Sequence, residues 1–347
     1  MTPSQNKKNK KPLIIVLCCF LGFLLVAVGA VGYLWFSGKN GLFKNDGTII
    51  SDIGVEAIVN EDNTVVYDGK VYKYNDNVTA ILCVGVDNKK KMSGGEYIVG
   101  NAGQADALYL MAIDTKSGKT TVLGIPRDTY TDISLYSKSG NYIGMEKKQI
   151  CLAYAYGDGR EKSCENTVSS VSKLLYGMPV NSYFAVDSKA ISALHNAVGT
   201  ITVVPNETLT AGGVTYYKNV PVKLYGSNVF EYLQVRNQET ADASYLRMER
   251  QLDYINKYSA AVIEKTKSDI TFPVKLYGKV QKNAVTNLDA GKIGYLATNI
   301  ISNKKTASLE FISLKGKQII GEGGYAEFYP DETNLFEAVL KLYYTEQ

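Results

Sequence analysis

The stretch VLGIPRDTYTDI, residues 122–133, carries the first group whose chemistry can be named. An apolar run ends there at Pro126 and is followed at once by Arg127 and Asp128. An arginine and an aspartate at a strand end form either a surface ion pair or part of an anion-binding site. A guanidinium keeps its charge and forms paired hydrogen bonds with phosphate oxygens. The position of Arg127 therefore raises a phosphate-binding hypothesis.

A pair of carboxylates borders two other apolar runs. Asp87 follows ILCVGV, and Asp106 comes just before ALYLMAI. If these runs are neighbouring strands, the two carboxylates face each other across the loop of residues 88–105. Two carboxylates and substrate phosphates together suit Mg²⁺, which prefers oxygen ligands. Aspartate is also a common turn residue, so a structural role stays open.

A third polar group lies in FEYLQVRNQETADASYLRMERQLDYI, residues 230–255. We interpret the apolar run before Arg236 as a strand, which places Gln238 on the same side as Arg236. Three further residues share one face near the start of a predicted helix: Arg247, Arg250 and Gln251. Several arginines beside an acid pair are typical of a pyrophosphate and metal site. The alternative is a solvated helix face paired with neighbouring acids.

Composition excludes several other classes of function. The chain has one histidine, His195, in a predicted helix, so multi-histidine metal sites are excluded and a serine–histidine–aspartate triad would have to use it. Without the four N-terminal lysines, 34 basic residues face 34 acidic ones. A nucleic-acid-binding domain usually carries a basic excess, so nucleic acid is not an expected partner.

The N-terminal 36 residues differ from the rest of the chain. Four lysines in residues 1–12 precede an uncharged stretch of 24 residues, 13–36, which is long enough to cross a bilayer core of about 30 Å as a helix. A cleaved signal peptide has a shorter apolar region, of about 7–15 residues. We predict a cytoplasmic basic tail, a transmembrane anchor at 13–36, a linker at 37–63 and an extracellular domain at 64–347, because flanking lysines stay in the cytoplasm.

The extracellular part alternates strand and helix patterns, which predicts an α/β layered domain. Residues 80–86 and 108–113 are almost continuously apolar, as in strands covered on both faces, and residues 119–126 form a third predicted strand. Asp68-Gly69 predicts a hairpin. The predicted helices are 165–177, 187–199, 242–267 and 332–344. Among the three cysteines outside the span, a Cys151–Cys164 disulfide stays open.

Taken together, these features resemble the LytR-CpsA-Psr family, bacterial enzymes that attach glycopolymers to the cell wall. The resemblance covers residues 78–257. It rests on six motifs in order: ILCVGVD, QADALYLMAID, LGIPRDTY, LAYAYGDG, AVGTITV and YLQVRN…LRMERQ. The resemblance implies one α/β domain with a central mixed sheet between helices and an apolar tunnel for a polyprenyl tail.

The resemblance also implies an activity and its site. The enzyme would be a membrane-anchored phosphotransferase that moves a glycopolymer, of the teichoic acid or capsular polysaccharide type, from polyprenyl pyrophosphate to peptidoglycan. Asp87 and Asp106 would bind Mg²⁺, and one would activate the acceptor hydroxyl. Catalysis would also use Arg127, Arg236 and Arg247. The pyrophosphate and lipid phosphate would be held by Arg127, Asp128, Arg236, Gln238, Arg247, Arg250 and Gln251.

Four positions depart from the family pattern. Gln238 replaces an arginine, Ser244 an acid, Gln149 a lysine and Cys151 an asparagine. These changes weaken the expected grip on pyrophosphate. They keep open a protein that binds polyprenyl phosphate without transferring anything, or a polyprenyl pyrophosphatase. The retained acid pair favours metal chemistry over binding alone.

Overall fold

The computed structural model describes residues 34–43, 55–60, 62–86, 102–226, 228–236, 242–303 and 308–347. Asp87, Gln238 and residues 13–33 of the predicted anchor lie outside these ranges. Of the helices within them, none has the length and hydrophobicity needed to cross a bilayer. The anchor therefore stays a prediction.

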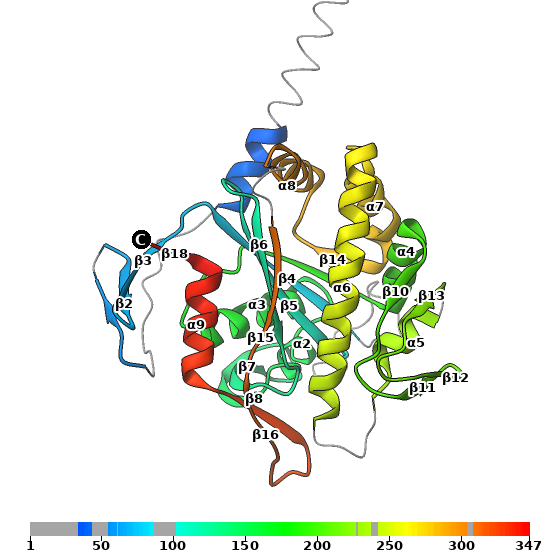
Figure 1. Ribbon diagram of the computed structural model, residues 1–347. Coiled ribbons are helices and arrows are strands. Elements are labelled where there is room, and N and C mark those ends of the chain that lie inside the picture. Colours follow the sequence, from blue (N-terminus) through cyan, green and yellow to red (C-terminus); the bar gives the residue numbers. More distant parts are fainter. Residues whose placement is uncertain are drawn as a thin grey trace, which may run out of the picture.

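A six-stranded mixed sheet forms the centre of the molecule (Figure 1). The antiparallel strands β4 (Val78–Val86), β5 (Ala105–Asp114) and β6 (Lys119–Ile125) lie in its middle. On either side, β9 (Ser182–Val186) runs parallel to β4, and β15 (Ser308–Ser313) runs parallel to β6. The three strands predicted from the sequence are confirmed, and β14 (Ala284–Thr286) completes the sheet beside β9.

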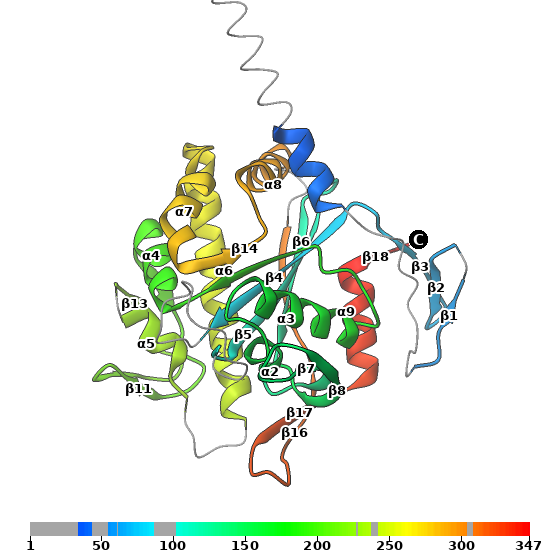
Figure 2. The same cartoon turned by 180° about the vertical axis from the view of Figure 1, so that it is seen from behind.

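Helices cover both faces of this sheet (Figures 1 and 2). On one face lies α6 (Ala243–Ser268), whose Met248 and Leu252 pack on β5 and β6. The other face carries α3 (Glu161–Leu174) and α9 (Glu332–Tyr343) in the largest apolar core. The expected α/β fold with a central mixed sheet between helices is confirmed.

One predicted strand is wrong. The residues before Arg236 form a helix, α5 (Asn228–Gln234). Its buried residues Val229, Tyr232 and Leu233 are spaced i, i+3 and i+4, which matches one face of a helix. They join a second apolar core, between α5, α6 and α4 (Ser188–Val198).

The segment predicted as a linker contains regular structure. Residues 34–42, which include the last three residues of the predicted anchor and the first six of the predicted linker, are helical, and Leu42 is buried in a cluster with Leu288 and Tyr295. Tyr295 belongs to α8 (Ala290–Ser302), so this first helix packs on the domain.

The hairpin predicted at Asp68-Gly69 is confirmed. It joins β2 (Thr64–Tyr67) to β3 (Lys70–Tyr74). Both turn residues have positive φ, 48° and 71°, as the two-residue turn of a twisted hairpin requires.

The remaining elements are shorter or peripheral. They are β1 (Ile58–Val59), β7 (Tyr130–Tyr136), β8 (Tyr142–Gln149), α2 (Leu152–Ala155), β10 (Ile201–Val203), β11 (Leu209–Ala211), β12 (Val214–Tyr216), β13 (Val222–Leu224), α7 (Phe272–Val280), the 3₁₀ turn Gln281–Asn283, β16 (Gly316–Ile320), β17 (Ala326–Pro330) and β18 (Tyr344–Glu346).

Candidate functional site

The turn that carries Arg127 and Asp128 is held by hydrogen bonds to the backbone. The N–H of Thr129 donates to the carbonyl of Pro126 at 3.0 Å, and the Thr129 hydroxyl donates to the same oxygen at 2.6 Å. The carbonyl of Asp128 accepts from the N–H of Phe328 in β17 at 2.8 Å. These bonds fix the point at which the Arg127 side chain leaves the end of β6.

Arg127 contacts four side chains. Its Nη1 forms an ion pair with Asp106 at the start of β5, and its Nη2 donates to Oε1 of Gln104. Its Nε lies 3.4 Å from Oδ1 of Asp128, and Nη2 lies 3.4 Å from Sγ of Cys151. The structure thus brings Arg127 together with one of the two acids predicted to bind metal.

Arg247 is buried and is 7% exposed. Its Nη2 donates to the backbone carbonyl of Asp106 at 3.2 Å. Burial, followed by the nearby charges of Arg127 and Arg236, lowers the pKa of Arg247 to about 10, because each disfavours a further positive charge. The guanidinium stays charged at neutral pH, and no carboxylate among the described residues forms an ion pair with it.

Arg236 follows α5 and is exposed. Its Nη1 donates to the hydroxyl of Ser244 at 3.2 Å, at the position where the resemblance leads one to expect an acid. Among the described residues no carboxylate forms an ion pair with Arg236, and a cavity of about 460 Å³ lined by Arg236 and Glu231 opens beside it. The three arginines Arg127, Arg236 and Arg247, called the arginine cluster below, meet only two acids in the described part of the chain, Asp106 and Asp128. An excess of positive charge favours an anionic ligand.

Arg250 does not belong to this cluster. Its side chain is 0% exposed, and its Nη1 lies 2.7 Å from Oε1 of Glu207. Its Nε donates to the carbonyl of Tyr232 at 3.1 Å, and its Nη2 donates to the carbonyl of Val235. The predicted contact of Arg250 with pyrophosphate does not fit this arrangement, because its donors are engaged by the protein. Its place is structural, at the junction of α5 and α6.

Gln251 is also engaged by the protein. Its Oε1 accepts from the hydroxyl of Tyr109 at 2.6 Å, and its Nε2 donates to the carbonyl of Leu233 at 2.7 Å. Gln251 thus links the sheet, α5 and α6 beside the arginine cluster, so it supports the site through other residues.

The predicted partner of Asp106 lies outside the described residues. Val86, which precedes Asp87 in the chain, pairs with Ala105, which precedes Asp106. Within the described ranges, no group of three or more histidine, cysteine, aspartate or glutamate side chains gathers to hold a metal ion. A metal site here would therefore depend on Asp106, Asp87 and ligands from water or substrate. Gln238 also lies outside the described residues.

Sequence reasoning missed Gln104, whereas Cys151, which the resemblance matched to an asparagine of the site, contacts Arg127. A signal for Gln104 was its place two residues before Asp106, just ahead of the strand that begins at Ala105.

Cys151, Cys164 and Cys83 are free thiols, so the disulfide considered above is absent. Burial raises the pKa of Cys151, which keeps the thiol neutral beside Arg127. Gln149 donates to the carbonyl of Ala326 at 3.2 Å, in β17.

His195 lies away from this cluster. It is 1% exposed in α4, and its Nδ1 lies 3.0 Å from the hydroxyl of Tyr254. Burial lowers its pKa, which favours the neutral imidazole inside the second apolar core.

Several known proteins are similar in sequence. The polyisoprenyl-teichoic acid–peptidoglycan teichoic acid transferase TagU of Bacillus licheniformis is 24% identical over 289 residues, covering 82% of this chain and 81% of the relative. The correspondingly named TagV of Bacillus subtilis is 26% identical over 335 residues, covering 94% of this chain and 77% of the relative.

Solved structures share the fold. Protein gbs0355 from Streptococcus agalactiae superposes with a TM-score of 0.62 at 21% identity, covering 77% of this chain and 86% of that one. The crystal structure of Bacillus subtilis TagV gives a TM-score of 0.57 at 23% identity, with coverages of 76% and 95%. TagT bound to LI-WTA gives 0.54 at 23% identity, with coverages of 77% and 89%.

The family comparison covers most of the chain. Residues 37–342 match the LytR_cpsA_psr family, and the matched range includes the whole arginine cluster. The resemblance found in the six motifs is thereby confirmed: the chain belongs to the LytR-CpsA-Psr family.

Proposed function

We propose that this protein is a membrane-anchored phosphotransferase that attaches a glycopolymer carried on polyprenyl pyrophosphate to peptidoglycan. The observation that carries the proposal is the arginine cluster, in which the buried Arg247 lies close to two further cations. The names of the relatives support it, since both are teichoic acid transferases that act between a polyisoprenyl carrier and peptidoglycan. We propose teichoic acid or a capsular polysaccharide as the polymer.

The proposed reaction needs little beyond positioning and charge neutralisation. The hydroxyl oxygen of the acceptor bonds to the phosphorus that bears the glycopolymer. The bond from that phosphorus to the bridging oxygen breaks, and polyprenyl phosphate leaves with the electron pair. The guanidiniums of Arg127 and Arg247 stabilise the negative charge on the phosphate oxygens, and Asp106 or Asp87 accepts the hydroxyl proton.

We propose Mg²⁺ as the cofactor, held by Asp106 and Asp87. These carboxylates fit the ion. The Asp106 side chain is 25% exposed near the start of β5, and hard carboxylate oxygens suit Mg²⁺. Bound Mg²⁺ would neutralise phosphate charge. On donor binding, Arg127 would exchange its contact with Asp106 for one with a phosphate oxygen.

The acids give a first prediction. Asp106→Ala and Asp87→Ala should each abolish Mg²⁺-dependent transfer and leave the protein folded, because one carboxylate supplies too few ligands. Transfer and Mg²⁺ binding are measured on the same preparation, and Asp132→Ala in β7 serves as the control. Full transfer by either site variant would contradict the metal assignment.

The proposed function is tested with purified full-length protein, a lipid-linked donor, peptidoglycan and Mg²⁺. We expect polymer-linked peptidoglycan together with free polyprenyl monophosphate. Polyprenyl monophosphate and unattached phosphorylated polymer would instead indicate the pyrophosphatase. Donor binding without either product would indicate the binding protein.

We propose the cell membrane as the location, with the N-terminus in the cytoplasm and the domain outside. The lysines before residue 13 and the uncharged stretch after them support this orientation. Protease added to intact spheroplasts should digest the chain beyond Gly38. Full protection of the domain would contradict the proposed orientation.

A further inference from the structure

The helix of residues 34–42 is fixed against α8, so the chain enters the domain from one defined side. A Cβ atom at Gly38 would lie 2.5 Å from the backbone of Gly291, so this close contact requires glycine. The rings of Trp35 and Tyr295 meet edge to face with centroids 5.1 Å apart. Leu42 is fully buried, which anchors the other end of the helix.

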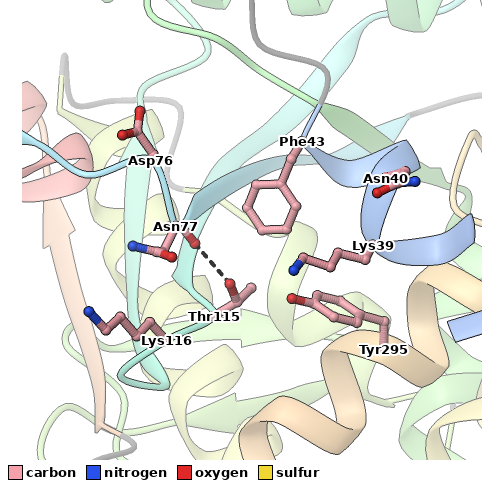
Figure 3. Close-up of a pocket in the computed structure, with 8 residues that line it drawn as sticks. All are labelled: Lys39, Asn40, Phe43, Asp76, Asn77, Thr115, Lys116 and Tyr295. Carbon is pink, nitrogen blue, oxygen red and sulfur yellow. Dashed lines mark hydrogen bonds between the residues drawn. The ribbon is translucent and has the colours of Figure 1, made fainter. Parts of the chain in front are cut away.

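Positive charge gathers beside this junction. A cavity of about 340 Å³ is lined by Lys39 of the first helix, Lys116 of the turn between β5 and β6, and Tyr295 of α8 (Figure 3). Figure 3 shows the Lys39 ammonium directed between the rings of Phe43 and Tyr295. Asp76 also lines this cavity, so two lysines face one carboxylate there and the lining carries a small excess of positive charge.

The corner between α6 and α7 lies at the end of the molecule at which the chain enters, in both views (Figures 1 and 2). Residues 264–282, called the α6–α7 corner below, contain five lysines and two carboxylates. Both carboxylates are already paired within the corner, Glu264 with Lys267 and Asp269 with Lys275. Lys279 and Lys282 are exposed and have no ion-pair partner in the described part of the chain. The corner is strongly positive, although the chain beyond its N-terminal lysines is formally neutral.

Apolar side chains stand exposed on the same corner. Ile270 is 57% exposed and Val274 is 40% exposed. Leu34 and Phe36, at the start of the first helix, are 54% and 58% exposed. Exposed apolar residues flanked by lysines are typical of segments that lie on an anionic membrane surface.

We propose that the α6–α7 corner is a membrane-contacting surface, which binds the anionic headgroups of phospholipids and inserts Ile270 and Val274 into the interface. The proposal rests on the membrane anchor proposed above. Its lysines would attract the lipid phosphates, and its apolar residues would retain contact once it is made. With the anchor as one contact and this corner as a second, the domain would keep a fixed orientation on the bilayer.

The test uses the single tryptophan of the chain, Trp35. Full-length Trp35→Phe/Ile270→Trp is placed in vesicles of phosphatidylcholine and phosphatidylglycerol with brominated acyl chains, which quench indole fluorescence at close range. Trp35→Phe/Ile143→Trp is the matched control, because Ile143 is 64% exposed in β8, at the opposite end of the molecule (Figure 1).

We expect the indole of Ile270→Trp to be quenched at least twice as strongly as that of Ile143→Trp. The difference should shrink in vesicles of phosphatidylcholine alone, and also when Lys279→Glu and Lys282→Glu are added. Equal quenching at both positions, or no dependence on phosphatidylglycerol, would overturn the proposal.

Extraction with alkaline carbonate distinguishes a failure of the proposed anchor from a failure of the proposal for the α6–α7 corner. Protein that is extracted completely has no anchor, which would overturn the anchor and this proposal together. Protein that stays in the vesicles without selective quenching would overturn only the role of the corner. Loss of transfer activity in the variants would change neither conclusion, because the readout is fluorescence.

Discussion

Arg247 and Arg250 lie three residues apart on α6, yet their surroundings balance charge differently. Arg250 has Glu207 and two backbone carbonyls as partners. Arg247 donates to one backbone carbonyl, and its pKa is lowered first by burial and then by the charges of Arg127 and Arg236. The Glu207 carboxylate, in contrast, opposes the effect of burial on the pKa of Arg250. Both guanidiniums are buried, so burial alone does not separate a structural arginine from a ligand-binding one.

The two arginines differ in whether a carboxylate of the protein pairs with the guanidinium. A buried cation with a carboxylate and filled donor positions contributes to folding, and removing it leaves the partner charge uncompensated. A buried cation among like charges is costly in the free protein, and an anionic ligand would remove that cost. We therefore assign folding to the Arg250 region and donor binding to the Arg247 region.

The largest expected effect is on stability. Arg250→Ala should lower the free energy of unfolding by about 3–5 kcal/mol, because it strands Glu207 in a partly buried position. Urea unfolding followed by circular dichroism measures the change, and Arg160→Ala, an exposed arginine of an ion pair, is the control. Wild-type stability in Arg250→Ala would contradict the structural assignment.

The next effect is on binding. Arg247→Ala should weaken donor binding by about 1.5–3 kcal/mol, the value of a hydrogen bond to a charged group, with no loss of stability. Arg127→Ala should behave similarly. Donor affinity is measured by titration beside urea unfolding. Unfolding of Arg247→Ala with the same loss of stability as Arg250→Ala would remove the distinction between the two regions.

A smaller effect concerns pH in the region of Arg250. His195 packs there against Tyr254, and burial holds its pKa below the usual value near 6.5. The unfolded chain therefore binds more protons as pH falls through that range, so stability should drop between pH 7 and 5. The variant His195→Gln should show a flatter dependence in urea unfolding at several pH values. Identical slopes would mean that His195 does not titrate on unfolding.

The smallest effect is a gain. Gln238→Arg should tighten donor binding by up to about 1 kcal/mol, as an exposed ion pair does, and leave stability unchanged. This expectation rests on the family resemblance, in which an arginine stands at the position of Gln238. The alternation of side chains along a strand no longer supports it, because the residues before Arg236 form the helix α5. Gln238→Lys is the control for charge alone. No change in donor affinity would place Gln238 away from the bound donor.

Much of the scaffold was predictable from the sequence, for identifiable reasons. β4 and β5 are almost continuously apolar, and Asp68-Gly69 is a known turn signal for a hairpin. In both cases the local sequence determines the secondary structure. The helix α5 was mistaken for a strand because short apolar runs suit either structure. Only its contacts with α4 and α6 decide the matter.

The site was predictable in part. Motif order placed Arg127, Arg236 and Arg247 together, and in the structure the charges of Arg127 and Arg236, after burial, lower the pKa of Arg247. Helical spacing also grouped Arg250 with Arg247. Spacing shows which residues share a helix face, but it does not show which other elements pack against that face. Glu207, the partner of Arg250, is 43 residues away in the chain, so no local sequence pattern predicts this ion pair.

The most direct test of the arginine cluster is the lipid that stays bound during purification. Full-length wild type, Arg247→Ala and Arg160→Ala are purified in the same detergent, and extracted lipids are quantified by mass spectrometry. The account predicts polyprenyl phosphate or pyrophosphate with wild type and Arg160→Ala, and at least tenfold less with folded Arg247→Ala. Equal amounts with all three proteins, or none with any of them, would contradict it.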